Sequence, residues 1–400
     1  MLLRILFIVH NMVWRGGGTF NRALHLGRHL VRRGHSVALL AVSLAERLKL
    51  RTGQVDGVII VESPDLLSGS LRSGWDPWNT LRRIHWLVGQ RFDLVHAFES
   101  RPVVIFPALF ARRYSQAPLV MDWCDWFGRG GSVAERPNRL IRQILNPAET
   151  FFEESFRTKA NGTTVINSQL RDRAIQLGVR EETILLLPQG SDVQRIQVLD
   201  RCQVRDQLGL PQEKFIIGYL GQTFPADARL LAETFERVIS EHADALLLLI
   251  GNRRTDISSL IKTPEAVVET GYLDDELLNQ YLGACDLFWL LLQDTLANRG
   301  RWPSKINDYM AAGRPTIATA VGDLTQLFQQ HDIGRLAQPD PEDIATQTLR
   351  FYDDASLHQQ CGAIARKVAT EQYAWEILTE GLVSFYQKVM ASCSRQKRGM

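Results

Sequence analysis

Lys305 and Asp308 are the two side chains in this 400-residue sequence whose spacing points most directly to chemistry. They are three residues apart in a segment with helical periodicity, so both would lie on the same side of one helix. Pro303 and Gly313 are expected to begin and end that helix, and the preceding loop contributes Arg301. A cation near backbone donors at a helix start binds phosphate, and a nearby carboxylate can accept hydrogen bonds from a hydroxyl pair. The segment therefore indicates a nucleotide site.

A second group of candidate residues follows the apolar strand expected at residues 119–121. Asp122 and Asp125 are three residues apart, and Trp123 and Trp126 follow them. Carboxylates at the end of a strand can orient an acceptor hydroxyl or act as a base, and the tryptophans can stack on a sugar ring or a lipid. Because such a carboxylate pair alone seldom binds a metal ion, no metal site is expected.

One histidine and one glycine turn complete the candidates. His96 lies in the strand expected at residues 94–97, where it is either a catalytic group or a hydrogen-bonded structural residue. The turn formed by Gly16, Gly17 and Gly18 opens a helix expected over residues 19–33. Its amides either face a phosphate or the acceptor, or the turn lets helix and strand pack closely. The turn lacks the spacing of a dinucleotide fingerprint, so no nicotinamide cofactor is expected.

Alternating strands and helices must position these residues. Short apolar runs separated by helical segments predict parallel strands with right-handed crossovers, twice along the chain. The expected strands of the first half are 2–9, 36–42, 57–61, 94–97, 119–121, 164–166 and 184–187. Those of the second half are 215–220, 245–250, 267–269, 287–291, 316–320 and 334–337.

This pattern predicts an α/β protein with two Rossmann-like, doubly wound domains that face each other across a cleft. The polar stretch over residues 192–213 has no long apolar run and marks the junction. The expected domains are 1–195 on the acceptor side and 196–377 on the donor side. A C-terminal helix over about 378–400 is expected to pack back on the first domain.

Charge is unevenly distributed between the two halves. Residues 1–195 carry 26 Lys and Arg against 17 Asp and Glu, whereas the remainder carries 20 against 27. The basic half is a candidate for peripheral contact with a membrane, through helix 26–33 or the run 81–86, although such faces are usually only solvated. No basic run interleaved with aromatic residues indicates nucleic acid. Five scattered cysteines and no signal-peptide pattern fit a cytoplasmic protein.

Several motifs, in order along the chain, resemble those of the retaining glycosyltransferases of family four, which have the GT-B fold. The resemblance covers nearly the whole chain and includes a Pro-Ser-Lys donor loop found in a subset of the family. The motifs are the glycine turn 16–19, Thr-Val-Ile-Asn-Ser at 164–168, Pro-Gln-Gly-Ser-Asp at 188–192, Gly-Tyr-Leu-Gly at 218–221, Gly-Tyr-Leu-Asp-Asp at 271–275 and Met-Ala-Ala-Gly-Arg-Pro at 310–315.

The resemblance implies a nucleoside-diphosphate sugar bound by the second domain, where the sequence departs from the family twice. The family's paired glutamates correspond to Gly300 and Asp308, so only the second position keeps a carboxylate, the expected ribose contact. The Arg/Lys pair that usually follows Gly221 is absent. We expect Lys305 and Arg301 to replace it on the diphosphate. The other expected donor contacts are Ser304, Asn298, Gln222 and Arg253.

The predicted function is retaining, metal-independent transfer of a sugar from the nucleotide donor to a hydroxyl acceptor, with no cofactor. The acceptor is a lipid-linked or polysaccharide intermediate, and the expected location is the cytoplasm or the inner face of the membrane. Two alternatives remain open. The chain either binds nucleotide sugars without catalysis, as its departures from the family would allow, or it epimerises them.

Overall fold

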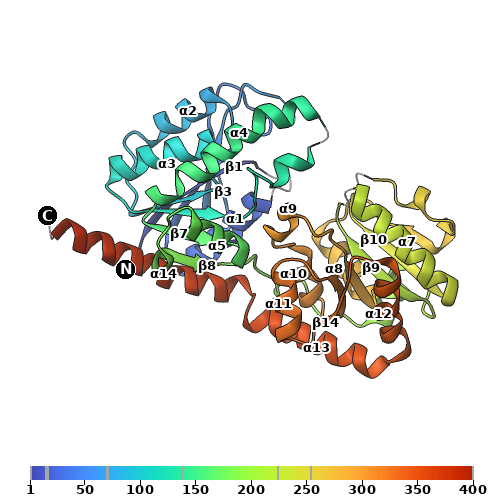
Figure 1. The fold of residues 1–400 in the computed structure, drawn as a ribbon. Coiled ribbons are helices and arrows are strands. Elements are labelled where there is room, and N and C mark those ends of the chain that lie inside the picture. The colour runs from blue at the N-terminus through green and yellow to red at the C-terminus, as the bar shows by residue number, and fades with distance from the viewer. Residues whose placement is uncertain are drawn as a thin grey trace. The chain divides into compact units, whose positions relative to one another are not determined.

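The computed structural model describes residues 2–13, 18–68, 72–136, 138–222, 225–252 and 255–398. The chain forms two compact units (Figure 1). The first comprises residues 1–188, 300–302 and 375–400, and the second comprises 189–299 and 303–374. The candidate residues Gly16, Gly17 and Arg253 lie outside the described residues.

Among the described residues, the first unit contains an eight-stranded sheet of order β3-β4-β2-β1-β5-β6-β7-β8. All neighbouring strands are parallel except the β3–β4 pair. The strands are β1 (Arg4–Met12), β2 (Ser36–Val42), β3 (Arg51–Val55), β4 (Val58–Ser63), β5 (Leu94–Phe98), β6 (Leu119–Trp123), β7 (Gly162–Val165) and β8 (Ile184–Leu186).

Helices cover both faces of this sheet. Alternate residues of a strand point to opposite faces, and Phe7 packs with α1 and α14, whereas Leu6 packs with α3. The helices of this unit are α1 (Gly18–Arg32), α2 (Pro77–Leu87), α3 (Pro102–Ser115), α4 (Arg139–Ser155), α5 (Ser168–Gln176) and α14 (Trp375–Arg398).

The second unit contains, within the described ranges, a six-stranded sheet of order β11-β10-β9-β12-β13-β14, parallel throughout. The strands are β9 (Phe215–Leu220), β10 (Ala245–Ile250), β11 (Val267–Glu269), β12 (Leu287–Leu290), β13 (Thr316–Thr319) and β14 (Gly334–Ala337). The helices are α6 (Arg201–Leu208), α7 (Pro225–Glu241), α8 (Asp275–Ala284), α9 (Leu296–Arg299), α10 (Lys305–Ala311), α11 (Asp323–Gln330), α12 (Pro341–Asp353) and α13 (Ala355–Glu371).

The predicted fold class is confirmed, and every expected strand is present with ends that shift by a few residues. Sequence reasoning missed β3, because its residues Arg-Thr-Gly-Gln-Val are polar and mostly exposed. The helix expected to begin at Pro303 begins at Lys305 instead. The boundary between the units follows Pro188, a few residues before the expected position, and α14 begins at Trp375.

The C-terminal helix α14 is held to the first unit by its apolar side and by one buried hydrogen bond. Leu382 and Phe385 join the core formed by α1 and the sheet. The Tyr386 hydroxyl lies 2.6 Å from His96 Nδ1 on β5. Both side chains are almost completely buried, so neither partner can exchange this bond for water.

We expect Tyr386→Phe to lower the free energy of unfolding by about 1–3 kcal/mol, because it leaves a buried His96 nitrogen without its partner. Ser384→Ala on the same helix is the matched control, since the exposed Ser384 hydroxyl donates to the backbone oxygen of Glu380 within the helix itself. Urea denaturation of both variants measures the difference. Equal stabilities would show that the His96–Tyr386 bond does not secure α14.

Candidate functional site

Lys305 is the first residue of α10 and is partly withdrawn from water. Its Nζ lies 4.0 Å from the centre of the Tyr219 ring, a cation–π contact with a buried side chain of β9. Burial lowers the pKa of Lys305 to about 8, and the charge of Asp227 opposes this shift. The residue is therefore still a cation at neutral pH, with few protein groups to stabilise its charge. Ser304 precedes it as the helix cap and is exposed.

Asp308 lies one turn further along α10. Burial raises the pKa of its carboxyl to about 6, although Arg195 lowers it. Arg195 Nη2 is 3.8 Å from Asp308 Oδ1, too far for a hydrogen bond, and the same guanidinium lies 2.7 Å from Asp275. The Asp308 side chain is 22% exposed. It can therefore accept hydrogen bonds from a ligand.

Tyr309 fixes α10 against the carboxyl end of β9. Its hydroxyl accepts a hydrogen bond from Leu220 N at 2.9 Å, and its ring stacks on Phe288 with a centroid distance of 4.0 Å. Gly221 follows β9 with a φ of 83°, a value that favours glycine. Lys305 and Asp308 thus have fixed positions relative to this glycine turn.

A polar cavity of about 590 Å³ opens at the carboxyl ends of β10 and β11 in the same unit. This volume lies within the range of small-molecule sites. A Cβ built on Gly251, which lines the cavity, would lie 3.7 Å from the backbone of Gly221. Gln222 is exposed beside this turn. The lining residues are Gly251, Asn252, Thr255, Asp256, Ser258, Glu269, Thr270 and Gly271.

The other predicted donor residues have structural partners. Asn298 is buried, and its Nδ2 donates to the backbone oxygen of Gln293 at 2.8 Å. Gly300 is also buried. Arg301 belongs to the first unit, where its Nη2 lies 2.8 Å from Glu135 Oε2. Its role at the diphosphate stays a prediction.

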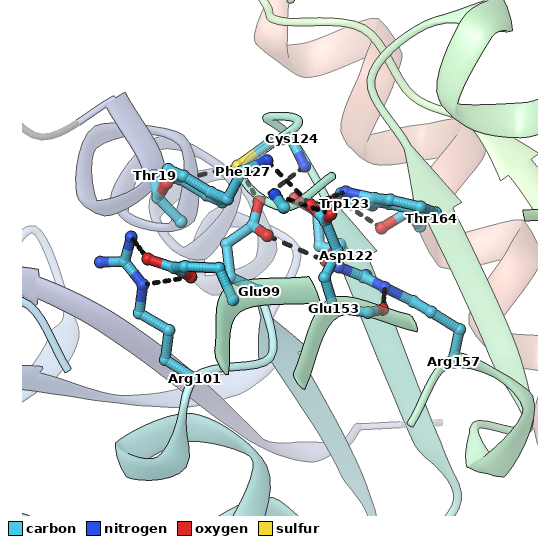
Figure 2. A network of polar contacts seen from close by, with 12 residues as sticks. Thr19, Glu99, Arg101, Asp122, Trp123, Cys124, Phe127, Glu153, Arg157 and Thr164 are labelled. Atoms are coloured by element: carbon cyan, nitrogen blue, oxygen red, sulfur yellow. Dashed lines mark hydrogen bonds and ion pairs between the residues drawn. The ribbon is translucent and has the colours of Figure 1, made fainter. Parts of the chain in front are cut away.

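Asp122 is the centre of a buried polar network at the carboxyl edge of the first sheet (Figure 2). Arg22 of α1 donates to both of its oxygens, at 3.0 and 3.1 Å, and Thr164 of β7 donates to Oδ1. Burial favours the neutral acid, but the guanidinium of Arg22 outweighs it and lowers the pKa of Asp122. Arg22 Nη2 also donates to the backbone oxygen of Leu187.

His96 belongs to the same network. Its Nε2 lies 3.2 Å from the Thr164 hydroxyl, and its Nδ1 contacts Tyr386. Burial lowers the pKa of His96 to about 3, so the ring is neutral at physiological pH. Neither His96 nor Asp122 is exposed, and this geometry does not support their predicted catalytic roles. Instead, His96 contacts Tyr386 and Thr164, and Asp122 binds Arg22.

The two tryptophans also differ from their predicted role. Trp123 is completely buried, with Arg157 4.2 Å above its ring, and Trp126 is 8% exposed with Arg173 at 4.2 Å. Because arginines already stack on both rings, the structure offers neither to a sugar. The sequence showed two aromatic residues near a strand end, but not the guanidinium groups that fold over them.

Asp125 is the accessible carboxylate of the predicted pair. Its side chain is 28% exposed, and Arg301 Nε lies 3.4 Å from Oδ1. Burial raises the pKa of Asp125 to about 6, although Arg301 lowers it. Among the candidate catalytic residues it is the one that a substrate hydroxyl can reach, and its pKa allows it to exchange a proton near neutral pH.

Sequence reasoning missed Glu99 and Cys124, which lie beside this network. Glu99 Oε1 accepts from Cys124 N at 2.8 Å and from Cys124 Sγ at 2.9 Å. The backbone of Glu99 has a φ of 72°, an uncommon value for this residue type, and burial raises its pKa to about 8 despite Arg157. The thiol also lies 3.3 Å from the Thr19 hydroxyl at the start of α1, next to Gly18. No sequence pattern marks these long-range contacts.

Among the described residues, no group of three or more His, Cys, Asp or Glu side chains is arranged to hold a metal ion. The proposed absence of a metal in catalysis stays a prediction, since a substrate can bring its own ion.

Two family models match the chain, one in each half. Residues 17–190 match a "Glycosyl transferase 4-like domain", and residues 214–354 match "Glycosyl transferases group 1". The N-acetyl-alpha-D-glucosaminyl L-malate synthase of Bacillus anthracis is 26% identical over 199 residues, which cover 48% of this chain and 50% of that protein. The chain therefore spans about half the length of this relative.

Solved structures resemble the chain over nearly its whole length. Sucrose-phosphate synthase from Thermosynechococcus elongatus superimposes with a TM-score of 0.74 at 17% identity, covering 97% of this chain and 99% of that one. HepE from Anabaena, crystallised with UDP-glucose, gives a TM-score of 0.67 at 16% identity, covering 98% and 100%. At this level of identity the likeness shows the fold, which is GT-B.

The buried Asp122 and the half-buried Asp125 should respond differently to the same substitution. Asp122→Asn leaves Arg22 buried without a counter-charge and is expected to cost about 3–5 kcal/mol of unfolding free energy. Asp125→Asn, at a half-buried position, is expected to cost about 1 kcal/mol or less. Urea denaturation followed by tryptophan fluorescence measures both. Similar losses for the two variants would contradict a structural role specific to Asp122.

Proposed function

We propose that this chain, whose two halves match a glycosyl transferase 4-like domain and the glycosyl transferases group 1 and whose fold is GT-B, transfers a sugar from a nucleoside-diphosphate donor to a hydroxyl acceptor. We further propose that the anomeric configuration is retained and that no bound metal is required. The resemblance to family four supports retention, and Lys305 supplies a positive charge where a metal would otherwise neutralise phosphate.

The pairing of Lys305 with Asp308 carries this proposal. Both side chains come from α10 and flank the carboxyl end of β9, where doubly wound domains bind ligands. Both have pKa values displaced toward neutrality by burial. A diphosphate placed on Lys305 and a ribose on Asp308 would supply the partners that the protein itself does not provide. The cavity lined by Gly251 and Gly271 adjoins the Gly221 turn, and we assign the nucleoside to it.

The reaction requires the bond between the anomeric carbon and the phosphate oxygen to break. Its electron pair goes to the diphosphate, whose added charge Lys305 stabilises. The acceptor oxygen forms the new bond to the same carbon, and its proton passes to the departing diphosphate or to water. We propose that Asp125 accepts a hydrogen bond from the acceptor hydroxyl and orients it, as its partial exposure allows.

A uridine nucleotide is the first donor to test, because HepE, which has the same fold, was crystallised with UDP-glucose. A thermal-shift screen with uridine, guanosine and adenosine diphosphate sugars identifies the base, since the tightest ligand raises Tm most. Turnover of the selected donor with hydroxyl acceptors then tests transfer, and NMR of the product gives its anomeric configuration. Donor binding without turnover would indicate a non-catalytic protein. Sugar conversion without an acceptor would indicate an epimerase.

Lys305→Ala is expected to lower kcat/KM for the donor by about 10²–10³-fold, the usual effect of removing one group that stabilises developing charge. Lys305→Arg should recover part of the loss, because it restores the charge in a different geometry. Lys367→Ala is the matched control, since Lys367 is an exposed lysine of α13 in the same unit. Unchanged donor kinetics for Lys305→Ala would remove this residue from the site.

Donor affinity is expected to be highest between pH values of about 6 and 8. Below about 6 Asp308 becomes protonated and loses its capacity to accept both ribose hydrogen bonds. Above about 8 Lys305 becomes neutral and no longer attracts the diphosphate. Calorimetric titration with an intact nucleotide sugar measures this profile without interference from the second ionisation of a free diphosphate.

Two variants assign the limbs of the pH profile. Asp308→Asn should remove the fall in affinity on the acid side, because the amide does not titrate. Lys305→Arg should remove the fall on the alkaline side, because arginine stays charged. If the fall on the acid side persists in Asp308→Asn, or the fall on the alkaline side persists in Lys305→Arg, then a different titrating group causes that fall.

A further inference from the structure

Helix α4 has an unusual distribution of side chains, because it buries two glutamates although several of its large apolar residues are exposed. Glu149 and Glu153 are only 3% and 2% exposed, whereas Leu140, Ile144 and Phe151 are 69%, 71% and 55% exposed. A helix on the surface of a soluble domain normally shows the opposite arrangement. Two explanations are therefore needed, one for the buried glutamates and one for the exposed apolar residues.

The buried glutamates have specific partners within the first unit. Glu149 accepts from Arg101 Nη2 at 2.7 Å and from its Nε at 3.2 Å. Glu153 accepts from the backbone nitrogens of Phe127 and Gly128, both at 2.9 Å. These bonds fix the rotation of α4 about its axis. With both carboxylates directed inward, the helix has no freedom to bury its apolar side instead.

The exposed apolar residues form a continuous ridge. Leu140, Ile144, Pro147 and Phe151 follow one another at intervals of three or four residues, so they lie along one side of the helix. The ridge continues into aromatic side chains at its C-terminal end. Phe151 lies 5.3 Å from Phe152, centre to centre, and Phe152 contacts Phe106 of α3 at 5.9 Å. Phe106 is itself 42% exposed, and Figure 1 shows α4 as one long helix near α3.

The charge beside this ridge is positive. Arg139 and Arg142 lie in the first turns of α4, ahead of any carboxylate of the helix. Of its three acidic residues, Glu149 and Glu153 are the two buried ones, and Glu154 is paired with Arg173 at 2.6 Å. At the other end, Lys159 Nζ lies 5.5 Å from the Phe156 ring centre.

We propose that the α4 ridge, formed by Leu140, Ile144, Pro147 and Phe151, binds the surface of a lipid bilayer that contains anionic lipid. Apolar side chains on one side of a helix, flanked by arginine, are the features of a helix that lies in the membrane interface. A second copy of the chain fits less well, because the carboxylates of α4 are buried or already paired with arginine and so cannot meet the arginines of a partner ridge. The contact is superficial, since none of the helices in the described ranges is long and apolar enough to cross a membrane.

This surface differs from the basic segments that the sequence suggested. In α1, Leu26 and Leu30 are completely buried against the sheet, so the apolar side of that helix is not available. Leu81 of α2 and Val88, which follows the end of α2, are 60% and 57% exposed. They provide a comparison for α4 within the same unit. The proposal does not depend on the sugar-transfer reaction, and its test uses no substrate.

The test is co-sedimentation of the full chain with vesicles of phosphatidylcholine alone or with about one-third phosphatidylglycerol. We expect binding to the anionic vesicles that weakens as salt is raised. Leu140→Gln with Ile144→Gln should weaken it about tenfold or more by removing apolar area. Arg139→Gln with Arg142→Gln should have a similar effect, because each basic residue near such a surface contributes about a fivefold factor.

Leu81→Gln with Val88→Gln, at and just after α2, is the matched control and should bind as the unmodified chain does. Thermal melting of each variant verifies that it is folded, which exposed positions should permit. Absence of binding to anionic vesicles, or unchanged binding by both α4 variants, would overturn the proposal. So would loss of binding in the α2 variant. If ultracentrifugation showed that the α4 variants dissociate a dimer while vesicle binding persists, the ridge would be a self-association surface instead.

Discussion

The buried ion pair between Arg22 and Asp122 is the interaction on which the carboxyl edge of the first sheet depends. Two opposite charges removed from water are stable only when their remaining hydrogen-bonding groups are also satisfied. Here Arg22 reaches the backbone oxygens of Leu187 and Pro188, and Asp122 accepts from Thr164. Helix α1, strands β6 and β7 and the segment that follows β8 therefore meet at a single pair of charges. Asp125 lies three residues after Asp122, so this network also holds in place the backbone that leads to Asp125.

The Asp122 network and the α10 pair stabilise their charges in opposite ways. In the first, Asp122 has a guanidinium on both oxygens, and its pKa is lowered. In the second, Lys305 faces an aromatic ring and Asp308 has a cation beyond hydrogen-bond distance, so burial moves both pKa values toward neutrality. A ligand that supplies the missing partners stabilises the charged forms of such partly buried, incompletely paired groups most strongly. The contrast is the physical reason for placing donor recognition on α10.

Sequence reasoning predicts this fold well because a parallel strand covered on both sides must be apolar along its whole length, as in β9 and β10. It fails for β3, which is polar, and for the role of Asp122. A carboxylate at a strand end is typical of an active site, yet Arg22 is 100 residues away in the sequence, and no local pattern shows that the two are paired. Lys305 and Asp308 could be singled out from the sequence because their relation is local, three residues along one helix, and their role at the donor stays a prediction.

Helix α4 shows why an amphipathic pattern alone does not give the orientation of a helix. Sequence reasoning assumes that the apolar side of a helix is its buried side, whereas α4 buries glutamates. Glu153 holds the amides of Phe127 and Gly128 in the loop that follows Asp125. Any displacement of α4 must therefore carry this loop along or break both bonds. A helix that presents its ridge to a bilayer would then fix the acceptor-side loop at a set distance from the membrane, where a hydroxyl group borne by a lipid lies. The same inward glutamates that expose the ridge thus connect it to the candidate site.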